Sequence, residues 1–377
     1  MNLGIVCYPT YGGSGVLATE LGMALAQKGH NVHFITSHQP VRLNFLNPNL
    51  HFHEVFLEDY PLFHYQPYVL ALSSKLAEVV EKYDLDIVHV HYAIPHAYAA
   101  YMAKQMLKEK GINLPIVTTL HGTDITLVGS HPVYKTAVEF SINNSDVVTS
   151  VSDSLRKDTL RLFNINKEID VIHNFVDFVK QKDVNDDDCK RESLANSDEK
   201  IITHISNFRP VKRILDVITT FNEIKKSIPS KLLMVGDGPD REKAEIMAKE
   251  LGIKKNILFM GKSDEIREIL CFSDLFLLPS ETESFGLAAL EAMAARTPVI
   301  SSNSGGLPEV NIQGETGFLS DVGDISDMSE KAIFILEDEE RLNTFKDKAY
   351  DHAHKFSLKN ILPHYEEMYR RVKENCC

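Results

Sequence analysis

Two glutamates stand eight positions apart in the segment ETESFGLAALEAMAARTPVI, residues 281 to 300. Glu283 follows a strand-like run, 273 to 280, and Glu291 falls within an Ala-, Leu- and Met-rich stretch, 287 to 295, that predicts a helix. Eight helical residues rise about 12 Å, whereas the paired carboxylates of glycosidases lie roughly 5 to 9.5 Å apart. We therefore predict that the two glutamates bind different hydroxyls of one extended polyol. The alternative is that both are ordinary charges beside a helix.

A second group of candidate functional residues is basic. Arg209, Lys212 and Arg213 occur within five residues, at the start of a predicted helix, in a chain of net charge −13. Cations are disfavoured there because the helix dipole is already positive at its N-terminus. A bound diphosphate would neutralise the positive charge of these side chains. The alternative is a basic surface turn. Gly236 follows the next predicted strand, in VGDGPDREK, where a glycine lets the backbone approach a ligand closely.

A glycine-rich loop follows the first predicted strand. Its residues Gly13, Ser14 and Gly15 fit the dinucleotide pattern G-x-G-x-x-A, so an NAD-dependent oxidoreductase must be considered. That function also needs an acidic residue at the end of the second strand, and the next acid here is only Glu54. The loop is therefore predicted to bind a diphosphate at a helix N-terminus. A plain tight turn is the alternative.

Histidines occur just after the fourth predicted strand, 115–120, and within the preceding one, 86–92. His121 lies in TTLHGTDIT, where a polar side chain could contact a sugar, although a lone histidine is more often structural. His89 and His91 share one face of their strand, but no third ligand is evident nearby. Asp84 and Asp86 resemble an Asp-x-Asp metal signature yet precede their strand, at the wrong edge of the sheet. No metal site is predicted.

The elements that must position these residues alternate along the chain. Strand-like runs cover 3–8, 31–36, 86–92, 115–120, 146–151 and 169–174, and then 200–206, 231–237, 256–261, 275–280 and 298–302. Helix-like segments separate them, and the end reads as three helices at about 325–338, 340–354 and 358–375. This pattern predicts an α/β fold of two Rossmann-like doubly wound domains facing each other across a cleft. A charged stretch, 178–199, reads as their surface connection, and ligands are expected at the carboxyl ends of the strands.

Composition narrows the class of partner. The 377 residues are 44% hydrophobic, enough for two cores, and the pI near 5.7 argues against a general nucleic-acid or membrane surface. The N-terminus lacks a basic leader, and no apolar run approaches about 18 residues. We expect a cytoplasmic protein with no nucleic-acid partner and no membrane insertion.

Taken together, the motifs resemble a known family. The Glu283 to Glu291 spacing is similar to the E-x7-E signature of retaining GT-B glycosyltransferases of the family 4 type, and HNFVD, VGDGP and GGLPEV resemble its other landmarks. The segments CYPTYGGSGVLATELG, HFITSHQPVRLN, HVHYAIPHA, TTLHGTDIT and HISNFRPVKR resemble the bacillithiol-pathway members, which join N-acetylglucosamine to L-malate. The resemblance implies an acceptor-binding domain at 1–175, a nucleotide-sugar-binding domain at 176–357 and a helix at 358–377 that crosses back to the first.

The resemblance also implies roles for the matched residues. The donor UDP-GlcNAc would be bound by Glu283, by the backbone of Phe285, Gly286 and Leu287, by Glu291 at the ribose, by Gly236, and by Gly13, Ser14 and Gly15 at the diphosphate. Lys212 and Arg209 would neutralise the departing diphosphate in place of a metal, and His121 would line the sugar pocket. Many relatives carry Gly-Arg where this chain has Ser206-Asn207, so Arg209 is expected to replace the missing arginine beside Asn207.

The acceptor L-malate is a dianion and needs cationic or hydrogen-bonding partners. Arg42, after the second strand, and Arg156, at the start of the helix after the fifth, are the candidates, with Tyr92 and Thr119 as hydroxyl partners. Either arginine could equally be a surface residue. The resemblance suggests a homodimer. A nucleotide-sugar epimerase on the same fold, a related glycosyltransferase with another small acceptor and a non-catalytic sugar-nucleotide sensor are the remaining alternatives.

Overall fold

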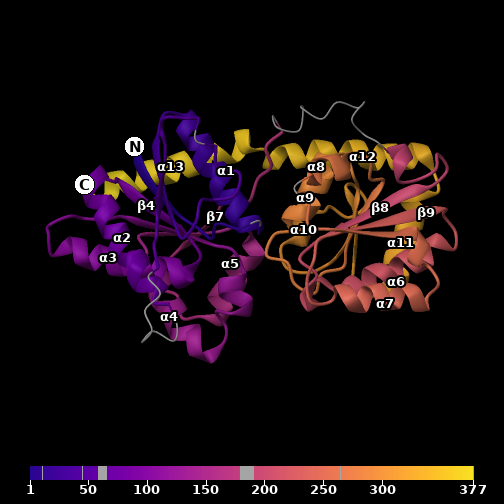
Figure 1. The fold of residues 1–377 in the computed structure, drawn as a ribbon, viewed down its shortest axis with the longest axis horizontal. Helices are drawn as coiled ribbons and strands as arrows, with labels where there is room; N and C mark the ends of the chain where they lie inside the picture. Colours follow the sequence, from indigo (N-terminus) through magenta and orange to yellow (C-terminus); the bar gives the residue numbers. More distant parts are fainter. Residues whose placement is uncertain (11, 45, 58–65, 179–190, 264, 377) are drawn as a thin grey trace. The chain divides into compact units, whose positions relative to one another are not determined.

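The computed structural model describes residues 1–10, 12–44, 46–57, 66–178, 191–263 and 265–376. The chain forms two compact units, one made of Met1–Asn174 with Lys359–Cys377 and the other of Phe175–Leu358 (Figure 1). Each is an α/β unit built on a parallel sheet. The prediction of two Rossmann-like doubly wound domains is confirmed.

The first unit contains a seven-stranded sheet within its described residues. Its elements are β1 (Asn2–Val6), α1 (Gly13–Gln27), β2 (Asn31–Thr36), β3 (Leu50–Glu54), α2 (Tyr68–Tyr83), β4 (Ile87–His91), η1 (Ala93–Ala97), α3 (Tyr98–Lys108), β5 (Ile116–Leu120), η2 (Thr123–Leu127), α4 (Pro132–Asn143), β6 (Val147–Ser150), α5 (Asp153–Leu162), β7 (Ile169–Val171) and α13 (Leu358–Cys376). The strand order is β3-β2-β1-β4-β5-β6-β7, so the direction of winding reverses between β1 and β4.

Alternation along β4 shows how both faces of this sheet are covered. Val88 and Val90 point into an apolar cluster with α2 and α3. His89 and His91 point to the opposite face, where the His89 Nδ1 atom lies 2.7 Å from the hydroxyl of Tyr369 on α13. Because side chains of a strand alternate between faces, one strand serves both layers. The histidines therefore belong to a buried polar layer beneath the terminal helix.

The second unit contains a six-stranded parallel sheet within its described residues. Its elements are η4 (Arg191–Ser193), β8 (Lys200–Ile205), η5 (Pro210–Lys212), α6 (Ile214–Lys225), β9 (Ser230–Val235), α7 (Arg241–Glu250), η6 (Lys254–Asn256), β10 (Ile257–Gly261), α8 (Ile266–Cys271), β11 (Leu275–Leu278), α9 (Leu287–Ala294), β12 (Val299–Ser302), α10 (Leu307–Val310), β13 (Gly317–Ser320), α11 (Ile325–Leu336), α12 (Glu339–Ala353) and η7 (His354–Phe356). The order β10-β9-β8-β11-β12-β13 reverses between β8 and β11.

The core of the second unit again lies on both faces of its sheet. Ile202 of β8 packs in a large cluster with α6, α7 and α11, whereas the adjacent Ile201 packs with Ile269 of α8. Figure 1 shows these helices around β8, one of the two central strands of the sheet. Near-continuous apolar strands are expected where helices cover both faces, and this is the pattern the sequence carries.

Two strands escape prediction from the sequence. β3 (LHFHE) and β13 (GFLS) lie at the edges of their sheets, and neither contains a long apolar run. Each is held by parallel pairing to one neighbouring strand, so the partner rather than its own composition makes it a strand. The three terminal helices are confirmed as α11, α12 and α13. Most of the predicted connection at 178–199 lies outside the described residues.

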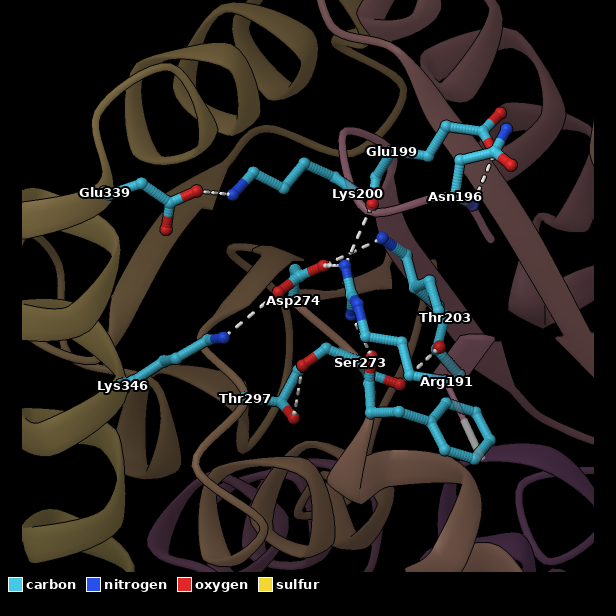
Figure 2. Close-up of polar contacts among 12 residues, drawn as sticks. Arg191, Asn196, Glu199, Lys200, Thr203, Ser273, Asp274, Thr297, Glu339 and Lys346 are labelled. Atoms are coloured by element: carbon cyan, nitrogen blue, oxygen red, sulfur yellow. Dashed lines mark hydrogen bonds and ion pairs between the residues drawn. The ribbon is translucent and has the colours of Figure 1, made fainter. Parts of the chain in front are cut away.

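A buried aspartate holds the amino edge of the second sheet together (Figure 2). Asp274, directly before β11, accepts hydrogen bonds from Arg191 Nη2 at 2.7 Å, from Lys346 Nζ at 3.0 Å and from the backbone N–H of Ile201 at 2.9 Å. Burial raises the pKa of this carboxyl, but Lys346, the Ile201 N–H and Arg191 together bring the pKa below its ordinary value. The group therefore folds as a carboxylate.

Replacing Asp274 by alanine is expected to lower the free energy of unfolding by about 2 to 3 kcal/mol, because it removes the acceptor of a buried N–H and of Lys346 and leaves Arg191 with backbone carbonyls alone. Chemical denaturation measures the change. Activity should persist, since this edge is opposite the strand ends that carry the site. Glu223→Ala is the control, since Glu223 pairs with Lys226 at the surface with side chains 39% and 63% exposed, and such pairs contribute less than about 1 kcal/mol.

The sign of the pH dependence follows from the lowered pKa. A carboxyl whose pKa falls on folding stabilises the folded state above its unfolded pKa of about 3.9, and that contribution disappears as pH falls toward the folded pKa. The difference between wild type and Asp274→Ala should therefore narrow below about pH 4. An equal loss in Glu223→Ala, or a difference that grows in acid, would contradict this assignment.

Candidate functional site

In the first unit, the loops after β1 and β4 meet where the winding direction reverses. The hydroxyl of Ser14, in the first turn of α1, lies 2.8 Å from the hydroxyl of Tyr92, which follows β4. Tyr92 has a φ of 89°, a left-handed conformation that is strained for a bulky side chain. Ligands bind at such reversal points in doubly wound sheets, so these two predicted residues are brought together at the expected place.

An aromatic cluster surrounds Tyr92. Its ring centroid lies 5.3 Å from that of Tyr8 and 5.2 Å from that of His121. His121 Nε2 lies 2.8 Å from His91 Nδ1, so the predicted site histidine has a buried partner on β4. Burial lowers the pKa of His121 to about 3 and raises that of Tyr92 to about 12. Both side chains are neutral near pH 7, and they can bind a ligand by hydrogen bonding or packing but not by charge.

The other predicted acceptor residues differ in accessibility. Thr119 is fully buried, and its hydroxyl contacts His89 Nε2 and Thr149 Oγ1, each at 2.7 Å. This geometry argues against a direct contact between Thr119 and an acceptor. Arg42 is partly exposed and lies 3.4 Å from the buried carboxylate of Glu20 on α1. Arg156 binds Asp153 at the start of α5, an ordinary pair three residues apart on one helix.

Asp124, in the TTLHGTDIT segment after β5, is a structural centre of this region. Its carboxylate is 2% exposed and accepts the backbone N–H of Ala93 at 2.8 Å, of Gly122 at 3.0 Å and of His121 at 3.2 Å. Burial raises the pKa of Asp124 to about 6, against the lowering effect of these donors. One side chain thus ties the loop that carries Tyr92 to the loop that carries His121. The signal available in the sequence was an acid four residues after the end of a strand, in the loop that also carries His121.

The glycine loop at the start of α1 has a packing requirement. A Cβ on Gly15 would lie 2.4 Å from the carbonyl oxygen of Tyr8 and 2.7 Å from that of Thr10. Gly15 is therefore needed for the close turn between β1 and α1. Gly13 is exposed at the helix N-terminus, with Ser14 half-buried beside it. Both the tight turn and an anion-binding helix start are compatible with this arrangement.

In the second unit, the loops after β8 and β11 are joined by an ion pair. Lys212 Nζ binds Glu283 Oε1, and Ser280 Oγ lies 3.0 Å from the same oxygen. The side chains of Lys212 and Glu283 are 20% and 13% exposed, so the pair is shielded but reachable. The backbone N–H of Glu281 also binds the carbonyl of Val211 at 2.8 Å. The two residues with the strongest catalytic prediction thus meet at the second reversal point.

Glycines 305 and 306 build the backbone around Glu283. A Cβ on Gly305, whose φ is +57°, would lie 1.9 Å from the carbonyl oxygen of Glu283. The N–H of Gly306 donates to that same oxygen at 2.8 Å. Only a residue without a side chain permits this approach. The GGLPEV segment therefore acts by shaping the loop that presents Glu283.

Helix α9 begins and ends close to its prediction. Gly286 precedes it with a φ of 97°, Leu287 is its first residue, and Glu291 lies inside it and is partly buried. The predicted helical position of Glu291 and loop position of Glu283 are confirmed. The residues between Glu283 and Gly286 are not helical, so the rise of about 12 Å estimated for a continuous helix does not apply to the whole interval. Phe285 is buried, leaving its backbone for any ligand contact.

The loop after β8, which carries Arg209 and Lys212, packs closely against the glycines that follow β9. Cβ atoms on Gly236 and Gly238 would lie 1.8 Å and 2.1 Å from the carbonyl oxygens of Ser206 and Asn207, respectively. Gly236 is thus explained first by packing against this loop. Asn207 and Arg209 are exposed. Their side chains are available at the surface, on the same loop as Lys212.

The sequence matches two family models and a close relative. Residues 11–180 match the model described as Glycosyltransferase Family 4, and residues 185–352 match the one described as Glycosyl transferases group 1. The chain is 48% identical over 375 residues, 99% of this chain and 97% of the relative, to N-acetyl-alpha-D-glucosaminyl L-malate synthase from Bacillus anthracis. The chain belongs to the GT-B glycosyltransferases. The family prediction is confirmed, and with it the prediction that the protein is an enzyme.

Solved structures agree on the fold of this glycosyltransferase. Sucrose-phosphate synthase from Thermosynechococcus elongatus covers 99% of this chain and 99% of its own, with a TM-score of 0.81 at 21% identity. The Anabaena protein HepE, in a complex with UDP-glucose, covers 98% of this chain and all of its own, with a TM-score of 0.83 at 18% identity. At these identities the likeness concerns the fold alone.

None of the helices in the described part of this glycosyltransferase has the length and apolar character needed to span a membrane. Within the same ranges, no group of three or more His, Cys, Asp or Glu side chains is arranged to hold a metal ion. His89 and His91 instead bond to Tyr369, Thr119 and His121. Metal-independent transfer stays a prediction.

Proposed function

We propose that this glycosyltransferase moves N-acetylglucosamine from UDP-GlcNAc to the hydroxyl of L-malate with retention of anomeric configuration. The proposed substrates are supported by the 48% identity, over 99% of the chain, to a relative named for that product. The Lys212–Glu283 pair at the reversal point of the second sheet supports the chemistry, because it sets a cation beside a hydroxyl-binding carboxylate.

The proposed step proceeds on one face of the sugar. The bond between the anomeric carbon and the β-phosphate oxygen breaks, the acceptor oxygen bonds to that carbon, and the departing phosphate oxygen takes the acceptor proton. Lys212 and Arg209 would stabilise the charge that develops on the diphosphate, which is the largest catalytic contribution available to fixed cations. Glu283 would bind donor-sugar hydroxyls, and Glu291 the ribose. On donor binding, Lys212 would exchange part of its contact with Glu283 for phosphate.

The remaining predicted contacts divide between the two units. In the second unit, the backbone of Phe285, Gly286 and Leu287 would approach the donor. In the first, His121 would line the sugar pocket as a neutral imidazole, and Gly13 and Ser14 would face the diphosphate. Tyr92 and Arg42 remain the proposed acceptor ligands, with Arg156 as the weaker arginine because Asp153 already binds it. Thr119 would act from inside the sheet by holding His89.

Acceptor-dependent release of UDP tests the proposal. Purified enzyme with UDP-GlcNAc should release UDP in a coupled assay only when L-malate is added, and NMR of the product should show the α-anomer. UDP release without malate would favour an epimerase. Binding of UDP without turnover would favour a sensor, and turnover only with a different acceptor in a small panel would replace malate as the substrate.

A further inference from the structure

Ser206 directly follows β8, and its hydroxyl has a defined partner. Ser206 Oγ lies 2.8 Å from Nε2 of His204, two residues earlier on β8. His204 is fully buried, and its ring lies nearly parallel to those of Phe208 and Phe276, with centroids 6.2 Å and 6.4 Å away. Burial and contacts at both ring nitrogens therefore fix the orientation of the imidazole.

Hydrogen-bond chemistry fixes the direction of every contact of this histidine. His204 Nδ1 lies 2.8 Å from the carbonyl oxygen of Leu277 on β11, and a carbonyl can only accept, so Nδ1 carries the proton. Burial lowers the pKa of His204 to about 4, which leaves the ring neutral and Nε2 without a proton near pH 7. The Ser206 hydroxyl must then donate to Nε2. Its oxygen is left to accept the backbone N–H of Phe208 at 3.3 Å.

This series of contacts ends at the backbone of Phe208, which leads to Arg209 and Lys212. Phe208 has a φ of 42°, a left-handed conformation that the surroundings must enforce for a residue with a side chain. Its N–H is held by Ser206, and its carbonyl accepts the N–H of Asp240 at 3.1 Å. Arg209 follows directly, and the N–H of Lys212 binds the carbonyl of Arg209 at 2.8 Å. The contacts thus link β11, the strand that leads to Glu283, to the loop that presents Lys212.

We propose that Ser206 is a positioning residue for glycosyl transfer, whose hydroxyl, oriented by His204, fixes the Phe208 backbone and so the placement of Arg209 and Lys212 toward the donor diphosphate. The inference rests on the proposed function for the identity of the ligand. A displacement of about 1 Å in such a loop is enough to lower turnover strongly, because fixed charges act through their position.

Ser206→Ala tests the proposal against a matched control. Ser273→Ala deletes the same atom from a buried hydroxyl pair with Thr203, 2.6 Å apart, at the amino edge of the same sheet. Ser206→Ala should weaken UDP binding, measured by calorimetry, and lower kcat by between about 10-fold and 100-fold. Ser273→Ala should change neither, although it should lower the unfolding midpoint by at least as much. Ser206→Thr, which keeps the hydroxyl, should restore most activity.

Two results would overturn the assignment. One is a Ser206→Ala enzyme with wild-type UDP affinity and turnover. The other is a loss of activity that tracks lost stability equally in both variants, which would reduce Ser206 to an ordinary packing residue. Should Ser206→Ala not yield folded protein, Ser206→Cys carries the same test, because a thiol fills the space but donates weakly. If the wild type fails to use malate, the proposed function falls, whereas UDP calorimetry still decides the role of Ser206.

Discussion

Replacing Lys212 by alanine is expected to lower kcat about 1,000-fold. Removing one preorganised hydrogen-bond donor from a developing oxyanion lowers kcat by about 10²- to 10³-fold, and the loss of a full positive charge is expected at the upper end of that range. The Lys212 side chain is 20% exposed and pairs with Glu283, which keeps its contact with the hydroxyl of Ser280 when the lysine is removed. The folded enzyme should therefore survive, with an unfolding free energy within about 2 kcal/mol of wild type. Steady-state UDP release and chemical denaturation measure the two quantities.

Glu283→Gln separates charge from shape in the same pair. It retains the side-chain volume but removes the charge that faces Lys212, and it should also lose most turnover if Glu283 binds donor hydroxyls. Lys226→Ala removes a cation from an exposed pair with Glu223 and should leave the rate unchanged. A near-normal rate in Lys212→Ala would contradict the role of Lys212 in neutralising the diphosphate. A normal rate in Glu283→Gln would leave Glu283 as a mere support for the lysine.

The second large effect is expected from Gly305→Ala. The new Cβ would need to occupy space 1.9 Å from the carbonyl oxygen of Glu283, so the backbone that carries this carboxylate must move. A shift of about 1 Å at a residue that binds the reacting sugar can cost 100-fold in rate. We expect at least that loss in kcat/KM for UDP-GlcNAc, with circular dichroism unchanged and only a modest fall in thermal stability.

Gly314→Ala provides a matched control for this substitution. Gly314 has a φ of +75°, close in kind to the +57° of Gly305, but a Cβ there would meet nothing within 4 Å. Both variants therefore carry the left-handed penalty of about 1 to 2 kcal/mol, and only Gly305→Ala disturbs Glu283. Similar kinetics for the two variants would show that the backbone of Glu283 tolerates displacement, contrary to the role proposed for it.

The sequence was a good guide wherever a local pattern has one physical outcome. Apolar runs separated by helical segments can only be buried parallel strands with crossovers, so the strands that carry the site and the helix containing Glu291 were predictable. Glycines and charges directly after those runs had to lie at one edge of each sheet. The edge strand LHFHE was missed because its polar residues alternate and its pairing with β2 supplies what its composition lacks.

Contacts between distant segments were decided only by the tertiary structure. Lys212 and Glu283 are 71 positions apart, and they meet because β8 and β11 become neighbours when the winding direction reverses. The same reversal brings Ser14 to Tyr92, and side-chain register places Thr119 inward against His89 instead of toward a ligand. Asp124 gains its role from backbone donors on two loops. The sequence by itself thus determined which residues reach the ligand edge of each sheet, because periodicity is local. Their partners depend on strand order and register, which emerge only when the whole sheet is assembled.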